Sequence, residues 1–408
     1  MTENKKNWTR RAFLKTAGVT GLGAALAPVG NQVQAATGTA QNKTPSGVVP
    51  TRPFGKTGVN VSILSLGGMF DIPNNQLLMK QAVRWGVTYW DTADCYEGGD
   101  SEEGIGKYFK KYPQDREKIF LVSKSDDRSP KGMSRLLDRS LERMNTTYVD
   151  LYFVHGVRKI KELNRATKEW AAQAKADRKI RFFGFSTHRN MEQLLLDAAK
   201  LGWVDGIMMT YNYRLMHTED MQAAVAACVK EGIGLTAMKT QGGGSVKTSS
   251  DTELELAGRF LRKGFTDKQA KLKAVWENPH IASICSQMPN LTILAANTAA
   301  AMDQTKLSRR DVELLQAYAD ETACDYCAGC GQICEAATQG QVPVSDIMRY
   351  LMYYRSYGER DRARALFREL PFATRRRLVA IDYTEAERRC PQKMAISKVM
   401  RTAAMTLA

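Results

Sequence analysis

Four side chains with complementary chemistry follow three neighbouring apolar runs of the sequence. Asp91 and Tyr96 come after the first run, and Lys124 ends the second. His155 follows the third. A phenol with its ordinary pKa of about 10 is a poor proton donor at neutral pH. A lysine cation beside it favours the phenolate, and a carboxylate tunes that cation. With a histidine to orient the oxygen, these groups can polarise a carbonyl and protonate it while a hydride arrives from elsewhere.

The opposing interpretation is that each residue is a solvated side chain at the end of a strand. Four matched positions on three successive strands favour the chemical interpretation. The elements that must position them are strands that alternate with amphipathic helical segments, such as 76–85 and 134–144. After a first strand near 63–66, the strand candidates are 87–91, 119–124, 149–155, 180–185, 204–210, 233–238 and 281–285. Eight such units predict an α/β fold, a (β/α)8 TIM barrel, whose catalytic residues project from the C-terminal ends of the strands.

At these residues the sequence resembles the aldo-keto reductases. Asp91, Tyr96, Lys124 and His155 fall on the Asp-Tyr-Lys-His tetrad of that family. The surrounding sequences agree: SEEGIGKYFK after the tyrosine, YVDLYFVHG around the histidine and FFGFSTHRN further on. The resemblance covers about residues 51–300. It implies that Tyr96 donates a proton to a small carbonyl substrate, or takes one from an alcohol, and that His155 orients the oxygen.

The resemblance also implies a nicotinamide dinucleotide, NAD(P)H, at the C-terminal face of the barrel. Ser186 matches the family residue that binds the carboxamide, and Asn212 and Asn297 match asparagines on the cofactor side. Each of these residues alone is also a common turn or cap residue. The stretch 281–302, where the family usually holds the 2′-phosphate of NADP, contains no Lys or Arg. A phosphate needs such partners, which leaves NADH, weak binding or a cation from elsewhere such as Lys239.

Two family positions on the cofactor side are changed. The glutamine of the sixth strand is Met208 here, and the aromatic residue that stacks on nicotinamide falls near 238–239.

Five of the eight cysteines form a separate pattern. Cys324, Cys327, Cys330 and Cys334 have the spacing of bacterial iron–sulfur ferredoxins, and Cys390 precedes a proline. A [4Fe–4S] cluster is the predicted occupant, with a four-thiolate zinc site or disulfides as alternatives. In two-cluster ferredoxins the cysteine before proline serves the other cluster. We therefore expect Cys324, Cys327, Cys330 and Cys390 as the ligands, with Cys334 a remnant of a lost second site.

The remaining cysteines, Cys95, Cys228 and Cys285, are isolated and are predicted to be small core residues. Helical periodicity at 344–369 predicts a helical insertion between the two halves of the cysteine pattern. The C-terminal part thus resembles the ferredoxin-like domain of one aldo-keto reductase subgroup, in a small and mainly helical form.

The N-terminus resembles a twin-arginine export signal, with the sequence TRRAFLK at 9–15 and an apolar stretch rich in Gly and Ala after it. The alternatives are a basic tail and a retained anchor, and no other segment reaches about 18 uninterrupted apolar residues. We expect a periplasmic or otherwise exported protein that does not span the membrane after cleavage. The expected divisions are a signal peptide at 1–36, a linker at 37–50, the barrel at 51–310 and the iron–sulfur domain at 311–408.

The chain is basic, with a net charge of +16, and residues 341–408 carry 14 Lys and Arg against 7 acidic residues. No basic and aromatic recognition motif accompanies this charge, so we expect no nucleic-acid partner. A solvated helical face, or a docking surface for an acidic partner, is the favoured interpretation of the charge. A redox partner protein is a further possible partner. Two functions follow: a carbonyl reductase or alcohol dehydrogenase, or an exported electron-transfer or ligand-binding protein on the same scaffold without nicotinamide turnover.

Overall fold

The computed structural model describes residues 47–244 and 250–408. The predicted signal peptide, most of the predicted linker and residues 245–249 of the loop after the seventh barrel strand lie outside the described residues. In the part of the chain that is described, no helix is both long and apolar enough to cross a membrane.

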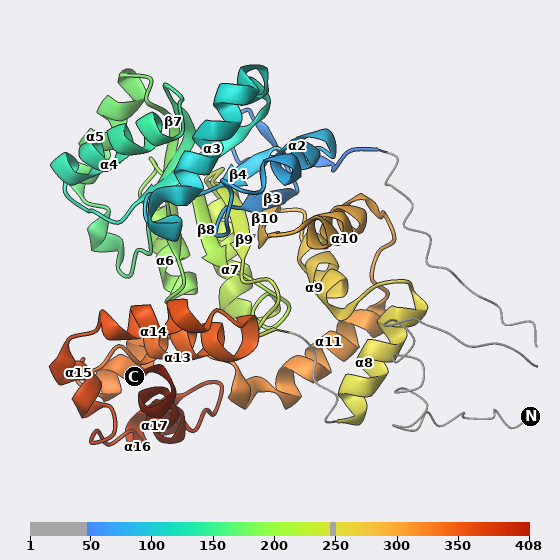
Figure 1. The fold of residues 1–408 in the computed structure, drawn as a ribbon. Coiled ribbons are helices and arrows are strands. Elements are labelled where there is room, and N and C mark those ends of the chain that lie inside the picture. The colour runs from blue at the N-terminus through green and yellow to red at the C-terminus, as the bar shows by residue number, and fades with distance from the viewer. Residues whose placement is uncertain (1–46, 245–249) are drawn as a thin grey trace, which may run out of the picture. The chain divides into compact units, whose positions relative to one another are not determined.

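Eight parallel strands close into a barrel, as the sequence predicted (Figure 1). Around the barrel their order is β10-β3-β4-β5-β6-β7-β8-β9. Their bounds are β3 Leu64–Gly67, β4 Tyr89–Asp91, β5 Phe120–Ser125, β6 Val149–Val154, β7 Ile180–Thr187, β8 Gly206–Thr210, β9 Gly234–Met238 and β10 Ile281–Gln287. Alternate residues point to opposite faces of a strand, so Tyr89, Leu151 and Phe153 fill the barrel while Trp90 and Tyr152 pack outward.

A short antiparallel hairpin of β1 Thr51–Pro53 and β2 Asn60–Ser62 precedes the barrel. Its Phe54 is fully buried in the cluster of side chains that fills the barrel. Gly206 and Gly234 begin strands β8 and β9, and a Cβ on either residue would lie within 3 Å of the Phe54 ring. The two glycines therefore make the space that this aromatic residue fills.

Helices connect the strands and pack their apolar faces on the outside of the barrel. They are α2 Gln76–Arg84, α3 Asp100–Lys111, α4 Pro130–Arg143, α5 Arg165–Ala176, α6 Met191–Ala199, α7 Glu219–Lys230, α8 Asp251–Arg262, α9 Asp267–Trp276 and α10 Leu291–Met302. Short 3-10 helices are η1 Tyr96–Gly99, η2 Pro113–Lys118 and η3 Ile160–Glu162. Several helices begin with a side-chain cap, for example Ser129 on the backbone amide of Gly132.

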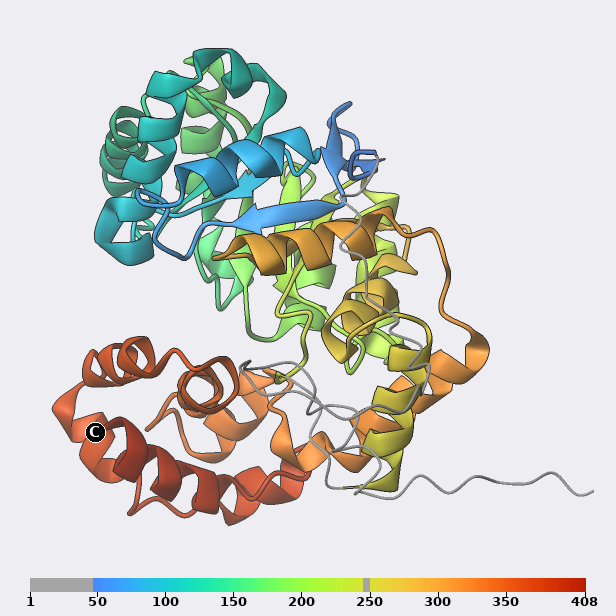
Figure 2. The same cartoon turned by 45° about the vertical axis from the view of Figure 1, so that its right-hand side comes forward.

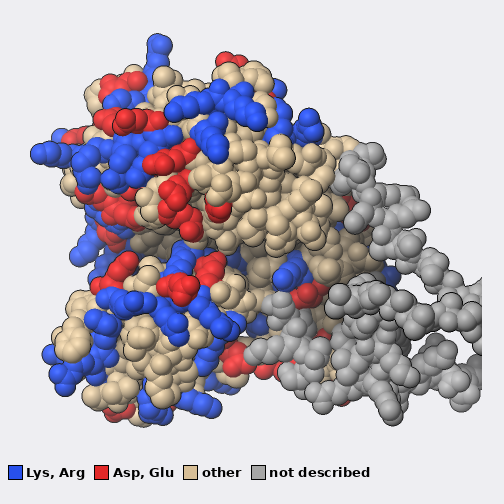
Figure 3. All heavy atoms as spheres, viewed as in Figure 1, with Lys and Arg blue, Asp and Glu red and all other residues tan. Residues whose placement is uncertain are grey.

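The C-terminal region is helical and has its own apolar core, which includes Ile347, Phe367 and Met400. Its elements are α11 Arg309–Glu321, η4 Ala323–Asp325, α12 Gly331–Ala337, α13 Val344–Met352, the π-helix η5 Tyr353–Tyr357, α14 Arg360–Arg368, α15 Phe372–Arg377, α16 Thr384–Arg389 and α17 Ile396–Leu407. Figures 1 and 2 show these helices gathered on one side of the barrel. Figure 3 shows Lys and Arg side chains over one face of this region, interspersed with acidic ones, so its basic excess is exposed at the surface.

A buried carboxylate joins this region to the barrel. Asp346 of α13 is 1% exposed and accepts from Arg189, which follows β7, at 3.0 Å. Arg158, after β6, lies 2.9 Å from the same carboxylate, and Arg349 of α13 lies 3.0 Å from it. Arg189 also pairs with Glu335 of α12. The arginines that follow β6 and β7 therefore keep these ion pairs only when α12 and α13 pack against the ends of the strands.

Replacing Asp346 is expected to destabilise this junction. Asp346→Ala removes one of the two carboxylates that pair with the buried Arg189 and leaves Glu335 as the other. Breaking a buried ion pair costs about 3–5 kcal/mol, and because Glu335 remains we expect a loss near the lower end of that range. Urea unfolding of the protein measures the loss. Asp138→Ala removes an exposed carboxylate that pairs with Lys179 on the barrel, and we expect it to cost less than about 1 kcal/mol. Equal losses in the two variants would contradict a special role for Asp346.

Candidate active site

The ammonium of Lys124 lies at the centre of the site and is 1% exposed. Its Nζ donates to Asp91 Oδ2 at 2.8 Å, to the Thr92 carbonyl oxygen at 2.6 Å and to the Tyr96 hydroxyl at 3.1 Å. The three donors of a lysine thus have three acceptors. Burial is the largest influence and works against the charged form, but Asp91 and Tyr96 together outweigh it and raise the pKa of Lys124 above its ordinary range. Lys124 is therefore a fixed cation beside a phenol.

Tyr96 begins the short helix η1 just after β4. Its ring lies 4.5 Å from Lys124 Nζ, and its centroid lies 5.8 Å from that of His155. Burial raises the pKa of Tyr96 well above its usual value, and Asp91 adds to this, while Lys124 only partly offsets it. Lys124 lowers the pKa of Tyr96, as predicted from the sequence, but the effect of burial is larger. Tyr96 is therefore protonated in the free site and ready to donate.

His155 follows β6, and its Nδ1 lies 2.8 Å from Asp126 Oδ1. The Cys95 thiol lies 3.8 Å from the same nitrogen. Burial and Lys124 lower the pKa of His155, and Asp126 opposes them. Although burial acts to raise it, the pKa of Asp126 falls to about 2 because of its hydrogen bond to His155. Neutral His155 then donates from Nδ1 and keeps Nε2 as an acceptor, whereas protonated His155 presents a donor at Nε2.

Sequence reasoning missed Asp126. It comes two residues after Lys124, at the end of the same strand, and a carboxylate at that place is the signal that could have found it. A second carboxylate at this edge of the barrel fixes the histidine as Asp91 fixes the lysine. The site therefore consists of two ion-paired or hydrogen-bonded couples on either side of the phenol.

A cavity of about 410 Å³ opens beside these groups. Asp91, Tyr96 and His155 line it, so three of the four tetrad residues face it directly. Ser286 and Asn297 line it near β10 and α10. The C-terminal region adds a further wall, made of Tyr353, Ser356, Tyr357, Glu359 and Arg362. The cavity is thus a property of the barrel and the C-terminal helices together.

The predicted cofactor residues divide into two pairs. Asn297 and Lys239 both line the cavity, and Asn297 donates to Ser286 Oγ at 3.1 Å. Ser186 and Asn212 are buried and are held by the protein instead. The hydroxyl of Ser186 accepts from the Gly156 amide at 3.0 Å. The Asn212 amide donates to the Lys239 carbonyl oxygen at 3.1 Å and to the Tyr326 hydroxyl at 2.9 Å, so it fastens the C-terminal segment to the barrel.

Lys268 lines the same cavity and was not found from the sequence. The next residue, Gln269, donates to the Ala296 carbonyl oxygen at 2.8 Å, which sets this end of α9 beside α10 and Asn297. The sequence predicted Lys239 as a possible cation from outside 281–302, and Lys268 is a second one. The neighbouring helix α9 thus places an ammonium group at the cavity that the stretch 281–302 itself lacks.

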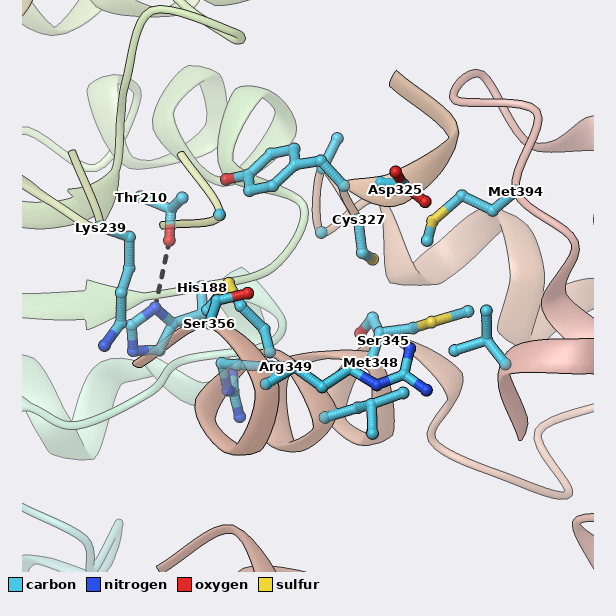
Figure 4. A pocket seen from close by; sticks show the side chains of 18 of the residues that line it. His188, Thr210, Lys239, Asp325, Cys327, Ser345, Met348, Arg349, Ser356 and Met394 are labelled. Atoms are coloured by element: carbon cyan, nitrogen blue, oxygen red, sulfur yellow. Dashed lines mark hydrogen bonds between the residues drawn. The ribbon is translucent and has the colours of Figure 1, made fainter. Parts of the chain in front are cut away.

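A second cavity, of about 130 Å³, lies between the strand ends and the cysteine segment (Figure 4). His188 and Lys239 line it on the barrel side, and Cys324 and Cys327 line it on the other. His188 Nδ1 lies 3.1 Å from Thr210 Oγ1. Burial, together with nearby cations such as Arg349, lowers the pKa of His188 well below its usual value. His188, Lys239 and Ser356 line both cavities, so neutral His188 stands between the tetrad and the cysteines.

The structure brings three of the four predicted cluster ligands together. Cys327, Cys330, Cys334 and Cys390 line one small hollow of about 20 Å³. Cys324 is exposed and does not line this hollow. The fourth thiol at the hollow is therefore Cys334, the residue that the sequence analysis set aside. Burial, with the neighbouring cysteines, raises the pKa of Cys327, Cys330 and Cys334 to about 12, so the thiols are protonated at neutral pH without a metal.

Comparison with known proteins identifies the family. The model of the "Aldo/keto reductase family" matches residues 65–309. The aldo-keto reductase yakc [NADP(+)] of Schizosaccharomyces pombe is 30% identical over 159 residues, which cover 34% of this chain and 45% of the relative. The versiconal hemiacetal acetate reductase of Aspergillus parasiticus is 29% identical over 225 residues, 45% of this chain and 64% of the relative. The chain therefore spans less than two thirds of either relative.

Solved structures agree on the barrel. The thermostable aldo-keto reductase Tm1743 is 26% identical, with a TM-score of 0.56 over 66% of this chain and 99% of that protein. An aldo-keto reductase from Klebsiella pneumoniae in complex with NADPH, 23% identical, has the same TM-score over 66% of this chain and 95% of its own, a likeness of fold. The chain belongs to the aldo/keto reductase family. It is an oxidoreductase of the NAD(P)-dependent kind.

The Asp126–His155 couple gives a direct prediction. We expect His155 to titrate below the ordinary histidine range, and Asp126→Asn to lower its pKa further, because the charged imidazole then loses its carboxylate partner. The asparagine still accepts a hydrogen bond, so the ring keeps its place. NMR of isotope-labelled imidazoles measures this, and a His155→Gln variant assigns the signal among the four histidines. A pKa that rises in Asp126→Asn would contradict the assignment.

Proposed function

We propose that the protein reduces a small carbonyl compound, or oxidises the corresponding alcohol, at the cavity beside Tyr96. One observation carries the proposal: the buried Lys124 ammonium bonds Asp91 and the Tyr96 hydroxyl at once, and Tyr96 faces a cavity of about 410 Å³. Ligand pockets of this kind are about 300–1,000 Å³. A protonated phenol beside a fixed cation suits proton donation to a carbonyl oxygen.

The proposed chemistry assigns each residue one task. The hydride to the carbonyl carbon would come from a nicotinamide held in the cavity. Tyr96 gives its proton to the carbonyl oxygen as that oxygen becomes negative, and Lys124 stabilises the phenolate that remains. Solvent returns the proton to Tyr96. Asp91 holds Lys124 in place, and His155 orients the oxygen, as a donor when protonated and as an acceptor from the alcohol when neutral.

The residues of the cavity fit a nicotinamide dinucleotide. Ser286 and Asn297 offer polar groups beside β10 and α10, and Lys268 offers an ammonium at the same place. A cation there suits a phosphate, so the absence of Lys and Arg from 281–302 no longer argues against NADPH. The relative named for NADP(+) and the structural neighbour named with NADPH support the same proposal.

Replacing the phenol tests the proposed reaction. Tyr96→Phe keeps the ring but removes the proton, so the turnover of a simple aldehyde with NADPH should fall about 10²–10⁴-fold. Binding of NADPH, measured by fluorescence, should change little. Tyr112→Phe, which alters a phenol at the end of α3, is the control. A Tyr96→Phe variant that keeps full turnover would sink the proposed function.

We also propose a [4Fe–4S] cluster in the C-terminal region. Four thiols around one hollow suit the thiolate donor set of such a cluster, and a bound cation would replace their protons. The convergence of Cys327, Cys330, Cys334 and Cys390 supports these four as the ligands, in preference to the set with Cys324. Export by the twin-arginine route is proposed from the sequence pattern at 9–15 alone.

A second function, electron exchange with a partner protein, is favoured by one observation. The cavity beside the cysteines and the cavity beside Tyr96 share His188, Lys239 and Ser356 as walls. An electron centre at the cysteines would therefore be close to the tetrad. An acidic redox partner suits the basic surface of this region.

The ligand set is open to a paired test. We expect Cys334→Ser to lose iron and the visible absorbance that dithionite bleaches, because its thiol lines the hollow. We expect Cys324→Ser to keep both. Iron content and the absorbance spectrum of the anaerobically purified proteins measure the outcome, and Cys228→Ser is a control at a core cysteine far from the hollow. Loss of iron in Cys324→Ser with retention in Cys334→Ser would restore the original assignment.

A further inference from the structure

Lys239 has an unusual backbone conformation. It follows β9 directly, with a φ of 57°. Residues other than glycine rarely occupy this left-handed region, and such strain persists where surrounding contacts fix it, often at functional sites. The conformation therefore calls for a reason in what the side chain does.

The partner of Lys239 is a second irregular element, the π-helix η5. π-Helices are rare and are frequent at functional sites. In η5, Tyr353 and Tyr357 stack with ring centroids 6.1 Å apart. Lys239 Nζ lies 4.6 Å from the centroid of Tyr353 and 5.4 Å from that of Tyr357. Two local departures from regular backbone thus meet in one contact, on the wall of the cavity that Tyr96 faces.

The charges around the cavity leave this ammonium without a carboxylate. Two acidic residues line the cavity among the described residues. The carboxylate of Asp91 forms an ion pair with Lys124 Nζ at 2.8 Å. The carboxylate of Glu359 forms an ion pair with the Arg362 guanidinium at 2.8 Å. Within the described part of the chain, no carboxylate lies within ion-pair distance of Lys239. Its aromatic contacts stabilise the cation but do not neutralise it.

The pKa of Tyr353 also indicates an excess of positive charge at this wall of the cavity. Burial alone raises the pKa of a phenol, yet Lys239, Arg349 and Arg362 together lower the pKa of Tyr353 below its ordinary value. Glu359 opposes them and does not win. This wall of the cavity therefore attracts negative charge.

We propose that Lys239, with Tyr353, Ser356 and Tyr357, binds an anionic group of the substrate, a carboxylate or a phosphate, while Tyr96 protonates its carbonyl. The inference rests on the proposed function and names its substrate class. It also separates the two free ammonium groups of the cavity. Lys268 lies beside α10 and serves the cofactor, whereas Lys239 lies against the C-terminal helices and serves the substrate. The sequence prediction of Lys239 as a cofactor residue is thereby reassigned.

Two matched pairs of aldehydes test the proposal. Succinic semialdehyde and butanal share a four-carbon chain and differ in a carboxylate, and glyceraldehyde phosphate and glyceraldehyde differ in a phosphate. The wild type should prefer at least one anionic member in kcat/KM. Lys239→Met should reduce that preference about ten- to a hundredfold, as expected for a hydrogen bond to a charged group. Lys239→Arg should retain most of it.

Two further variants fix the interpretation. Lys230→Met removes an exposed charge at the end of α7 and should leave the preference unchanged. Lys268→Gln should weaken NADPH binding and also leave the preference unchanged. A wild type that favours the neutral aldehydes overturns the proposal. A Lys239→Met variant that weakens NADPH binding and leaves the preference intact overturns it too, because Lys239 would then serve the cofactor.

A binding measurement keeps this test separate from that of the reaction. Calorimetry of the NADPH-loaded protein with succinate, and with inorganic phosphate, should give binding in the wild type that Lys239→Met loses. If no aldehyde is reduced but this difference remains, the proposed reaction fails and the anion site stands. If aldehydes are reduced and neither anion binds in a manner that depends on Lys239, the anion site fails and the reaction stands.

Discussion

The burial of one ammonium group constrains the whole mouth of this barrel. A lysine removed from water is costly unless every donor finds an acceptor and a counter-charge lies close by. Lys124 meets both conditions only when β4 and β5 keep their register, because Asp91 and Thr92 come from the first strand and its end and Lys124 from the second. Tyr96 completes the set from the turn that follows. The same contacts that make the cation tolerable therefore aim the phenol at the cavity.

The C-terminal helices extend this constraint beyond the barrel. Asp346 forms ion pairs with arginines that follow two barrel strands and with an arginine of its own helix. Asn212 of the barrel donates a hydrogen bond to the Tyr326 hydroxyl of the C-terminal region. These contacts carry the π-helix to the cavity, where Tyr353 and Tyr357 become part of its wall. The C-terminal region that bears the cysteines thereby also forms one wall of the cavity. The helix α13 connects the cysteine hollow to the cavity wall, because its Met348 lines the hollow and its C-terminal end leads into the π-helix.

The features that could be predicted from the sequence are those that depend on local sequence patterns. Buried strands follow short apolar runs, and their ends carry Asp91, Lys124 and His155, so the barrel was predicted correctly and these residues do meet Tyr96. The parts missed depend on contacts between distant segments. Arg189 and Asp346 are 157 residues apart, and Asn212 and Tyr326 are 114 apart. The periodicity of the sequence does not reveal that the Asn212 amide is hydrogen-bonded to Tyr326. Nor does it reveal that Cys334, and not Cys324, lies with the other thiols.

The three lysines of the site show why residue type alone could not assign these roles. All three carry the same charge, and their neighbours decide what that charge is free to do. Lys124 is paired with Asp91, so its charge acts on its immediate neighbour, the Tyr96 hydroxyl 3.1 Å away. Lys239 rests on aromatic rings, which hold it in place and leave its charge open to an anion. Lys268 is exposed beside α10, where a phosphate can reach it without desolvating a buried group. Lys239 and Lys268 both line the cavity and pair with no carboxylate of the described residues. Such a cavity suits a reaction between an anionic cofactor and an anionic substrate, because each of the two then has a cation of its own.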